Sequence, residues 1–185
     1  IIYSYLLGSI PFGLIITKQF LGKDIRKVGS GNIGTTNVLR TGKKSLAAVT
    51  LLFDVLKGYI SIIVAYKYFN ELVYLSGLIC FIGHIFPVWL RFKGGKGVAT
   101  YLGIILGISF ILAVIFVVVW LTTAIIFRYS SLSSILSSMI VFFYSIFLGN
   151  EMEIYFLFIA FAIIIFTHKG NITRLKNSKE SKIKL

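Results

Sequence analysis

The chain has few of the residues on which several kinds of catalysis depend. It contains one cysteine, two histidines and six acidic residues among 185 positions. Cys80 lies inside an apolar stretch, so no disulfide or metal cluster is expected and the residue is predicted to belong to the core. In the segments predicted below to be cytoplasmic, the carboxylates are Asp24 and Glu180, and no His–Glu metal set occurs. Hydrolysis by paired carboxylates or by zinc is therefore not supported.

Charge is also scarce along most of the chain. The hydrophobic fraction is 57% and the mean hydropathy is +0.93, whereas an ordinary soluble domain has about 45–50% apolar residues. A bilayer-spanning helix needs roughly 20 mostly apolar residues, so we expect an all-α integral membrane protein and no nucleic-acid partner. Six stretches are expected to be embedded in the membrane: residues 1–22, 45–66, 72–90, 98–127, 131–148 and 153–167.

The stretch 98–127 is longer than one membrane span requires. About 30 residues form a helix on the order of 45 Å long. Gly103 and Gly107 are expected to break this stretch into a short helix and a full span ending at Phe127. The prediction is thus about seven transmembrane helices, one of them short, in a single polytopic domain over residues 1–185.

The 19 Lys and Arg residues, which give a net charge of +13, gather in three segments. Residues 23–44 hold six of them, residues 91–96 three, and residues 168–185 six. Basic residues collect on the cytoplasmic side of membrane proteins, where they also attract anionic lipid. Seven elements with the N-terminus outside and the C-terminus cytoplasmic put all three segments on that side, whereas six would not. The tail after Lys176 is expected to be a solvated basic arm. Since the sequence begins with Ile1 rather than Met, no cleavable signal peptide is argued.

The first polar cluster, residues 29–40, contains three glycines together with hydroxyl and amide side chains. Glycines let backbone N–H groups converge on an anion, and Ser, Thr and Asn add neutral donors. An ordinary flexible loop uses the same residue types. A plain loop between two spans, however, does not need a run of this length that ends in Arg40.

The second cluster, residues 93–97, has the sequence Lys-Gly-Gly-Lys-Gly and leads directly into an apolar helix. A helix N-terminus preceded by glycines favours anion binding through its dipole and its unbonded N–H groups. The cluster is not a Walker loop, because Gly97 follows Lys96 where Ser or Thr would stand and position 90 is leucine. ATP hydrolysis is therefore not indicated, and a simple basic turn is the alternative.

The third cluster begins at His168, where the last apolar stretch ends. On a helix His168 and Asn171 share one face and Arg174 lies beside them, although His168 also suits a membrane-interface position.

Inside the spans, Asp54 and Lys57 are one turn apart and are expected to pair, either structurally or in support of a site. His84 precedes Pro87 and either lines a cavity or is a hydrogen-bonded core histidine.

Cationic groups and neutral donors dominate these clusters, which suits a reaction whose charge resides on phosphate groups. Together they resemble the PlsY family, the membrane-integral bacterial acyl-phosphate:glycerol-3-phosphate acyltransferases. The stretches that carry the resemblance occur in the family's order and cover nearly the whole chain: Gly8–Gly13, Val28–Arg40, Phe53–Gly58, Gly83–Thr100 and His168–Glu180.

The resemblance implies a reaction, a fold and a location. An acyl group would pass from acyl phosphate to the 1-hydroxyl of sn-glycerol 3-phosphate, giving lysophosphatidic acid and inorganic phosphate without metal, coenzyme A or another cofactor. The protein would be a seven-helix, multi-pass component of the bacterial inner membrane, in contact with membrane lipids, with its active site facing the cytoplasm. No oligomeric state is predicted.

The resemblance also implies roles for the residues of this sequence that match the family's motifs. The predicted catalytic residues are Ser30, Arg40, Lys96, His168 and Asn171. The predicted substrate-binding residues are Gly31, Asn32, Thr36, Asn37, Lys93, Gly94, Gly95, Gly97 and Arg174. The predicted supporting residues are Asp54, Lys57, His84 and Glu180. One departure is Ser178, which stands where the family's pattern has glycine, and it leaves the role of Glu180 open.

The residue types fit acyl transfer from a mixed anhydride, whose leaving group departs as phosphate and needs no strong general acid. We expect Lys96 and the backbone of residues 94–97 to hold one phosphate, and Arg40 with Ser30 and Asn32 to hold the other or the developing oxyanion. The attacking hydroxyl gives its proton either to His168 or to an oxygen of acyl phosphate. We favour the substrate oxygen, with His168 orienting the site.

Two other classes of function compete with this interpretation. A transporter or channel for a small phosphorylated anion could use the same clusters at broken helices, but all three are predicted on one face and no inverted hydropathy halves are visible. A scaffold recruited by anionic lipid would leave the glycine loops without a role.

Overall fold

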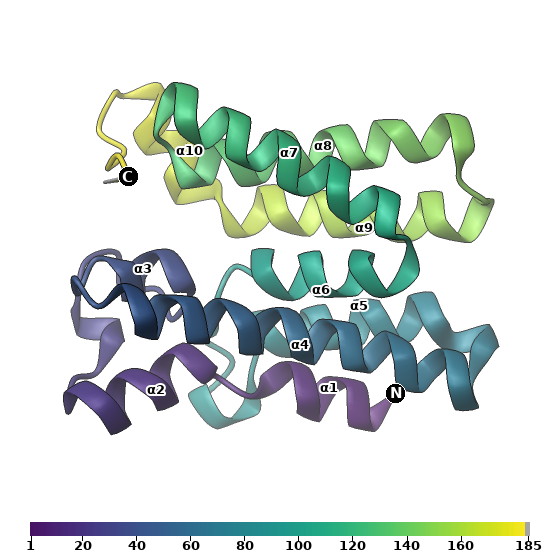
Figure 1. Ribbon diagram of the computed structural model, residues 1–185, viewed down its shortest axis with the longest axis horizontal. Coiled ribbons are helices and arrows are strands. Elements are labelled where there is room, and N and C mark those ends of the chain that lie inside the picture. Colours follow the sequence, from purple (N-terminus) through teal and green to yellow (C-terminus); the bar gives the residue numbers. More distant parts are fainter. Residues whose placement is uncertain (184–185) are drawn as a thin grey trace. The chain divides into compact units, whose positions relative to one another are not determined.

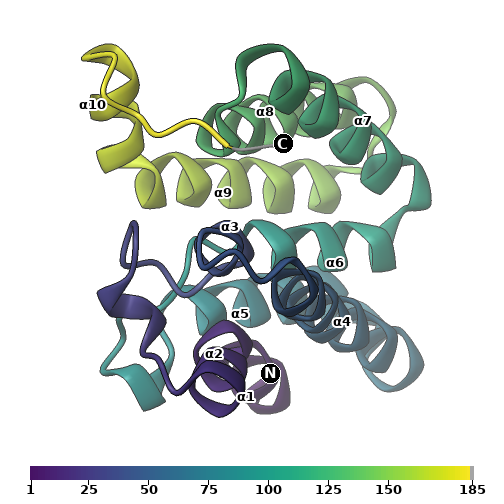
Figure 2. The same cartoon turned by 60° about the vertical axis from the view of Figure 1, so that its left-hand side comes forward.

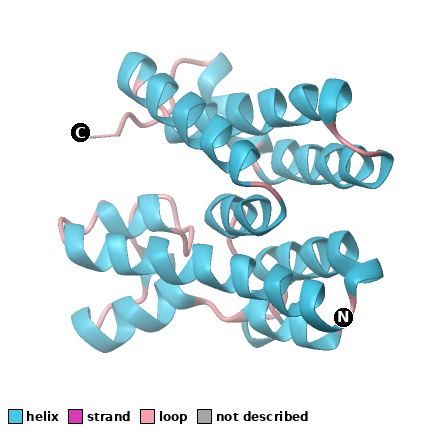
Figure 3. Ribbon diagram, turned by 45° about the vertical axis from the view of Figure 1, so that its right-hand side comes forward, coloured by secondary structure: helices cyan, strands magenta, loops and turns pink. Residues whose placement is uncertain are grey.

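A computed structural model describes residues 1–183, and every regular element in this part of the chain is helical (Figure 3). The chain forms two compact units, Ile1–Ile108 and Ser109–Leu185, which are described separately. Each of the six apolar stretches expected from the sequence contains at least one helix. The prediction of an all-α membrane-type protein is therefore confirmed in its coarse form.

The first unit is built around one long helix. Its helices are α1 (Ile2–Ser9), α2 (Phe12–Leu21), α3 (Thr35–Leu39), α4 (Lys44–Tyr68), α5 (Val73–Ile85) and α6 (Val98–Ile108). The helices α1 and α2 follow one another along α4 (Figure 1), and α3, α5 and α6 also pack against α4. This central helix consequently contacts every other helix of the unit.

The first apolar stretch is broken, which the expected span 1–22 did not anticipate. The break lies at Ile10–Pro11, between α1 and α2. Proline has no N–H to continue the helical ladder, so carbonyl groups near it lose their usual partners. Here the buried Lys57 side chain reaches across from α4, and its Nζ donates to the Ile10 carbonyl at 2.9 Å. At the break, the Ile10 carbonyl thus accepts from this buried cation as well as from the Phe12 N–H at 3.1 Å.

The expected break at Gly103 and Gly107 was wrong in position. Both glycines lie inside α6, and the helix ends at Ile108, before the extended residue Ser109. A Cβ at Gly103 would overlap the Val55 carbonyl, and one at Gly107 would lie 2.8 Å from Ile62 Cβ. These glycines let α6 approach α4 closely, as small residues do at helix contacts in membranes.

The second unit contains α7 (Phe110–Phe127), α8 (Ser130–Leu148), α9 (Glu151–Thr167) and α10 (Lys169–Lys176). The helix α8 packs between α7 and α9 and turns a set of small buried serines inward. Several of these serines bond to carbonyls of their own helix, so their hydroxyls are satisfied while the helices approach closely. At His168 the chain bends by 60° from α9 into α10 (Figure 2).

Four helical segments in the described residues are long and apolar enough to cross a bilayer: Lys44–Tyr68, Asn70–Leu90, Phe110–Phe127 and Ser130–Leu148. The bent pair α9–α10 makes a fifth if it counts as one span. The remaining elements of the seven-helix prediction are the broken pair α1–α2 and the 11-residue helix α6. The number of crossings therefore remains a prediction.

Candidate active site

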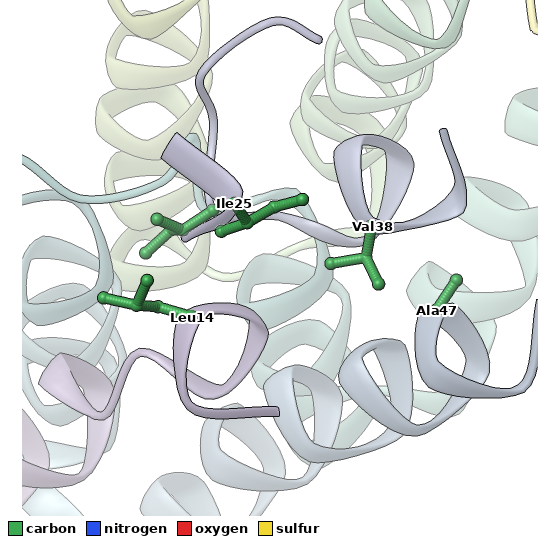
Figure 4. Close-up of a cluster of buried hydrophobic side chains, with 5 residues drawn as sticks. Leu14, Ile25, Val38 and Ala47 are labelled. Atoms are coloured by element: carbon green, nitrogen blue, oxygen red, sulfur yellow. The ribbon is translucent and has the colours of Figure 1, made fainter. Parts of the chain in front are cut away.

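The first polar cluster lies on a compact apolar base in the first unit. Val38 of this cluster and Ile25, which precedes it, turn inward toward Leu14 of α2 and Ala47 of α4 (Figure 4). Leu90, which precedes the second cluster, packs against the same base. Burial of these side chains therefore brings residues 25–40 and the approach to residues 93–97 to one end of the unit.

Asn37 shapes the first cluster from inside. Its side chain is 2% exposed, and its Nδ2 donates to the carbonyls of Ile25, Val28 and Asn32 at 3.0, 2.9 and 2.7 Å. Its Oδ1 accepts from the Ser30 N–H at 3.0 Å. Asn37 thus stabilises the loop through hydrogen bonds to its backbone. Contact between this residue and the substrate stays a prediction.

The other residues of this cluster lie on its outer side. Ser30 and Gly31 are exposed, and Gly31 has a positive φ of 71°, which favours glycine. The Asn32 side chain accepts from the Gly34 N–H at 2.8 Å and so tightens the turn. Thr36 is half-buried in α3, and Arg40 follows at its end with an exposed side chain. The Ser30 hydroxyl and the Arg40 guanidinium are thus both at the surface of this cluster.

The second cluster differs from its prediction in one respect. Backbone N–H groups of residues 94–97 were expected to face a phosphate. The Gly94 N–H instead donates to the Ile85 carbonyl at 3.0 Å, and the Gly95 N–H to the His84 carbonyl at 3.1 Å. These carbonyls end α5, where helices leave carbonyl groups without internal partners. Anion binding at this loop would then rest on Lys93, Lys96 and the residues after Gly95.

Gly95 lies directly against the His84 side chain. A Cβ at Gly95 would overlap His84 Nε2 and would lie 3.0 and 3.1 Å from its Cδ2 and Cε1. Gly97, with φ of 81°, similarly leaves no room for a Cβ beside Phe81. Glycine is therefore required at both positions by the protein interior beneath the loop.

A buried polar chain continues from His84. Its Nδ1 and Thr100 Oγ1 share a hydrogen bond at 3.1 Å, and Nδ1 lies 3.7 Å from Asp54 Oδ1. Asp54 pairs in turn with Lys57 at 2.8 Å, with both side chains at most 2% exposed. The predicted ion pair is therefore present, and His84 is the hydrogen-bonded core histidine of the two alternatives. The sequence did not single out Thr100, a polar residue in the first turn of an apolar helix.

The third cluster lies in the second unit, where α9 bends into α10. His168 is 2% exposed, and its Nδ1 lies 2.8 Å from the Ile164 carbonyl. A carbonyl only accepts, so Nδ1 carries the hydrogen in this bond, and in the neutral ring Nε2 is the acceptor nitrogen. This bond thus fixes the orientation of the ring.

Glu180 joins the predicted residues of this cluster. Its Oε1 accepts from Asn171 Nδ2 at 2.6 Å and from Ser131 Oγ at 2.9 Å, and its Oε2 accepts from Arg174 Nε at 2.7 Å. Partial burial raises the pKa of Glu180, but the hydrogen bonds from Asn171, Arg174 and Ser131 outweigh it and the net pKa is lowered. Glu180 is therefore a charged group that fixes Asn171 and Arg174. Ser131 was missed because only the fold brings it close.

The expected departure at Ser178 has a structural counterpart. Ser178 has φ of 55°, the left-handed conformation that favours glycine. The serine adopts it, and the chain still turns so that Glu180 reaches its partners. The substitution therefore does not remove Glu180 from the cluster.

The tail was predicted to be a solvated basic arm, and its described part is so only in part: Lys176, Lys179 and Lys182 are exposed, whereas Glu180 and Ile183 contact other residues of the second unit. The Ile183 N–H donates to the Arg128 carbonyl at 2.7 Å, and Arg128 Nε donates back to the Ile183 carbonyl at 3.3 Å. The Ile183 side chain is buried, and the Lys182 ammonium lies 5.8 Å from the Tyr129 ring centroid. The apolar and backbone groups of the tail thus dock on the turn between α7 and α8. Residues 184–185 of the expected arm lie outside the described residues.

The described residues contain no group of three or more His, Cys, Asp or Glu side chains arranged to hold a metal ion. Comparison with known proteins places these clusters in a family. The model of the family described as glycerol-3-phosphate acyltransferase matches residues 1–178. The chain belongs to the glycerol-3-phosphate acyltransferase family.

Relatives in this family match over nearly their whole length. The glycerol-3-phosphate acyltransferase of Pelagibacter ubique is 50% identical over 98% of this chain and 95% of its own. That of Mesorhizobium japonicum is 51% identical over 99% and 94%. The crystal structure of PlsY, an integral membrane glycerol 3-phosphate acyltransferase, in its glycerol 3-phosphate form has a TM-score of 0.95 at 38% identity, over 99% of this chain and 93% of that one. The lysophosphatidic acid form has a TM-score of 0.90 at 37% identity, over 98% and 92%.

The family match ends at residue 178, before the docked tail. All predicted catalytic and substrate-binding residues fall inside the matched region, whereas Glu180 and Ile183 follow it. The three polar clusters thus lie within the matched region, and the relatives and the PlsY structure align over 98–99% of this chain.

Proposed function

We propose that this chain transfers a fatty acyl group from acyl phosphate to the 1-hydroxyl of sn-glycerol 3-phosphate, producing lysophosphatidic acid and inorganic phosphate. The observation that carries this proposal is the near-complete match to PlsY structures described as glycerol 3-phosphate and lysophosphatidic acid forms. These two molecules are the acceptor and the product of the proposed reaction. A transporter of phosphorylated anions has no comparable support.

The residues of the first unit suit the phosphate groups. Arg40 and Lys96 are cations that can balance phosphate charge, and charge-assisted hydrogen bonds are the strongest that such groups form. Ser30 and Asn32 add neutral donors beside Arg40. Because acyl phosphate carries its own good leaving group, positioning and electrostatic stabilisation by these residues supply most of the catalysis.

The residues of the second unit suit the acceptor hydroxyl. His168 is oriented by its bond to the Ile164 carbonyl, and in the neutral ring Nε2 accepts hydrogen bonds. Such a nitrogen can align the 1-hydroxyl through its O–H. The proton itself passes to an oxygen of acyl phosphate, which becomes the departing phosphate, so the step balances without a protein base. The Asn171 amide, which is fixed by Glu180, is a second oriented polar group beside the His168 imidazole in this cluster.

We further propose a seven-element topology in a bacterial inner membrane, with the N-terminus outside and the three basic clusters facing the cytoplasm. Lys and Arg placement supports this orientation. Single cysteines at Ser30, Asn70, Asn150 and Asn177 in a Cys80→Ala background test it. An impermeant thiol reagent added to intact cells should label only the variants at 70 and 150, and labelling at 30 would invert the topology.

The donor and the reaction are tested together. Purified protein supplied with palmitoyl phosphate and glycerol 3-phosphate in EDTA should form lysophosphatidic acid. Equal or faster reaction with palmitoyl-coenzyme A, or loss of activity on chelation, would overturn the proposed donor or the metal-free mechanism. Flux of glycerol 3-phosphate into proteoliposomes without acyl transfer would favour the transporter instead.

A further inference from the structure

The first unit contains a buried polar chain for which the proposed reaction has no direct use. It runs from the Ile10 carbonyl through Lys57 and Asp54 to His84 and Thr100. Charged and polar groups within a membrane-type core are costly and require partners. This chain ends directly beneath Gly95, the centre of the basic glycine loop of residues 93–97.

His84 contacts this loop in two ways. The His84 carbonyl accepts the Gly95 N–H at 3.1 Å, and the imidazole edge fills the space where a Gly95 side chain would stand. Its Nδ1 also bonds to Thr100, in the first turn of the helix that follows the loop. One residue therefore holds the middle of the loop and the start of α6.

The ring cannot turn without breaking buried contacts. His84 is 4% exposed and Thr100 is fully buried. Asp54, on the other side of Nδ1, is itself held by Lys57, whose ammonium also binds the Ile10 carbonyl. Rotation of the imidazole would separate Nδ1 from Thr100, and this would leave buried polar groups without partners.

We propose that His84 is a positioning residue for the glycerol 3-phosphate acceptor: it sets the height of Gly95, and with it the place of Lys96 and the N-terminus of α6. This inference rests on the proposed function, in which residues 93–97 hold the acceptor's phosphate. His84 lies below the loop and is not a catalytic residue. Its loss should therefore weaken acceptor binding more than donor binding.

A double-mutant cycle between His84 and Gly95 tests this contact. Gly95→Ala should raise KM for glycerol 3-phosphate by about tenfold or more, because its methyl group displaces the loop. In a His84→Ala background, Gly95→Ala should raise KM for glycerol 3-phosphate less than about threefold, because loss of the imidazole leaves room for the methyl group. If Gly95 is needed only for close approach to phosphate, the effect will be equal in both backgrounds, and this result would overturn the proposal.

His84→Ala alone should raise KM for glycerol 3-phosphate by about three- to tenfold and leave KM for acyl phosphate within about twofold. Ser76→Ala, at a buried position two turns earlier in α5, is the matched control and should change neither constant. Equal changes in both KM values would indicate general loss of packing and would contradict a positioning role.

A second pair of variants covers a failure of His84→Ala to fold. Thr100→Val removes the hydrogen bond to Nδ1 and keeps the side-chain shape, whereas Thr100→Ser keeps the hydroxyl. Only Thr100→Val should raise KM for glycerol 3-phosphate, and identical behaviour of the two would count against the inference.

Hydrogen exchange of the Gly94 and Gly95 amides gives a readout that does not need acyl transfer. Exchange should accelerate in Thr100→Val and not in Thr100→Ser. This holds even if the chain proves not to use glycerol 3-phosphate, so failure of the positioning role and failure of the proposed reaction can be told apart. Unchanged exchange in Thr100→Val would overturn the positioning role.

Discussion

The two units hold their predicted site residues by different means. In the first unit, the glycine loop rests on His84, Asp54 and Lys57, which are buried among helices. In the second, Asn171 and Arg174 are held by Glu180, which arrives when the end of the chain folds back onto the turn before α8. A buried charge network tolerates no missing member, whereas a carboxylate near the surface remains open to solvent conditions. The two means of support should therefore fail differently.

The largest effect should follow removal of one charge from the buried pair. Lys57→Met leaves Asp54 without its cation and removes one of the two donors to the Ile10 carbonyl, so it should cost about 3–5 kcal/mol of stability. The measurement is the unfolding midpoint of detergent-purified protein in a denaturant titration. Lys67→Met, at the exposed end of the same helix, is the control and should change little. The double variant Asp54→Asn/Lys57→Met should recover much of the loss, and a double variant as unstable as Lys57→Met would contradict this account.

The next comparison sets a cation of the first unit against the histidine of the second. Lys96→Ala should lower kcat/KM by at least about 10²-fold, since phosphate charge loses a partner. His168→Gln, which keeps a polar group near Nε2, should remain within about tenfold of wild type if the substrate oxygen takes the proton. Steady-state rates on correctly inserted protein decide the matter. A His168→Gln variant as inactive as Lys96→Ala would make His168 the base.

A smaller effect should separate the units by pH. The pKa of Glu180 is lowered from its ordinary value of 4.5, so its contribution to stability is fully present above about pH 4.5 and is lost as pH falls through the folded-state pKa. Wild type should therefore lose about 1–2 kcal/mol relative to Glu180→Gln on acidification. Parallel unfolding curves at about pH 3 and pH 7 measure this difference. Ser131→Ala removes one of the three donors to Glu180, so it should reduce this pH-dependent loss of stability. A stability difference between wild type and Glu180→Gln that is the same at both pH values would argue against a charged Glu180.

The smallest effect concerns the turn that delivers Glu180. Ser178→Gly should raise stability by about 0.5–1 kcal/mol, because glycine adopts the positive φ of 55° without strain. Asn177→Gly, at a residue with φ of −92°, should instead be neutral or destabilising. Thermal unfolding of both variants provides the comparison. If Asn177→Gly stabilised the protein by the same amount, backbone strain at Ser178 would not be the cause of the stabilisation by Ser178→Gly.

Sequence reasoning succeeded where the signal was local. Apolar runs predicted α4, α8 and α9 to within about two residues of their ends, and spacing alone predicted the Asp54–Lys57 pair. It failed where the outcome depended on a distant partner. Nothing in the loop sequence shows that the Gly94 and Gly95 N–H groups bond to the end of α5, that Gly103 packs on Val55, or that the tail returns to Arg128.

The Lys57 contact at Ile10 also has a consequence for how the chain enters the membrane. A ribosome delivers α1 and α2 before α4 exists, so during that interval the interrupted N-terminal segment lacks the ammonium that later completes it. The Ile10 carbonyl then has the Phe12 N–H, at 3.1 Å, but lacks its second and charged donor, and weakly bonded backbone groups are costly in hydrocarbon. We therefore expect membrane integration of the first segment to depend on synthesis of a helix more than 30 residues downstream, so truncated nascent chains that stop before Lys57 should be retained less firmly than those that include it.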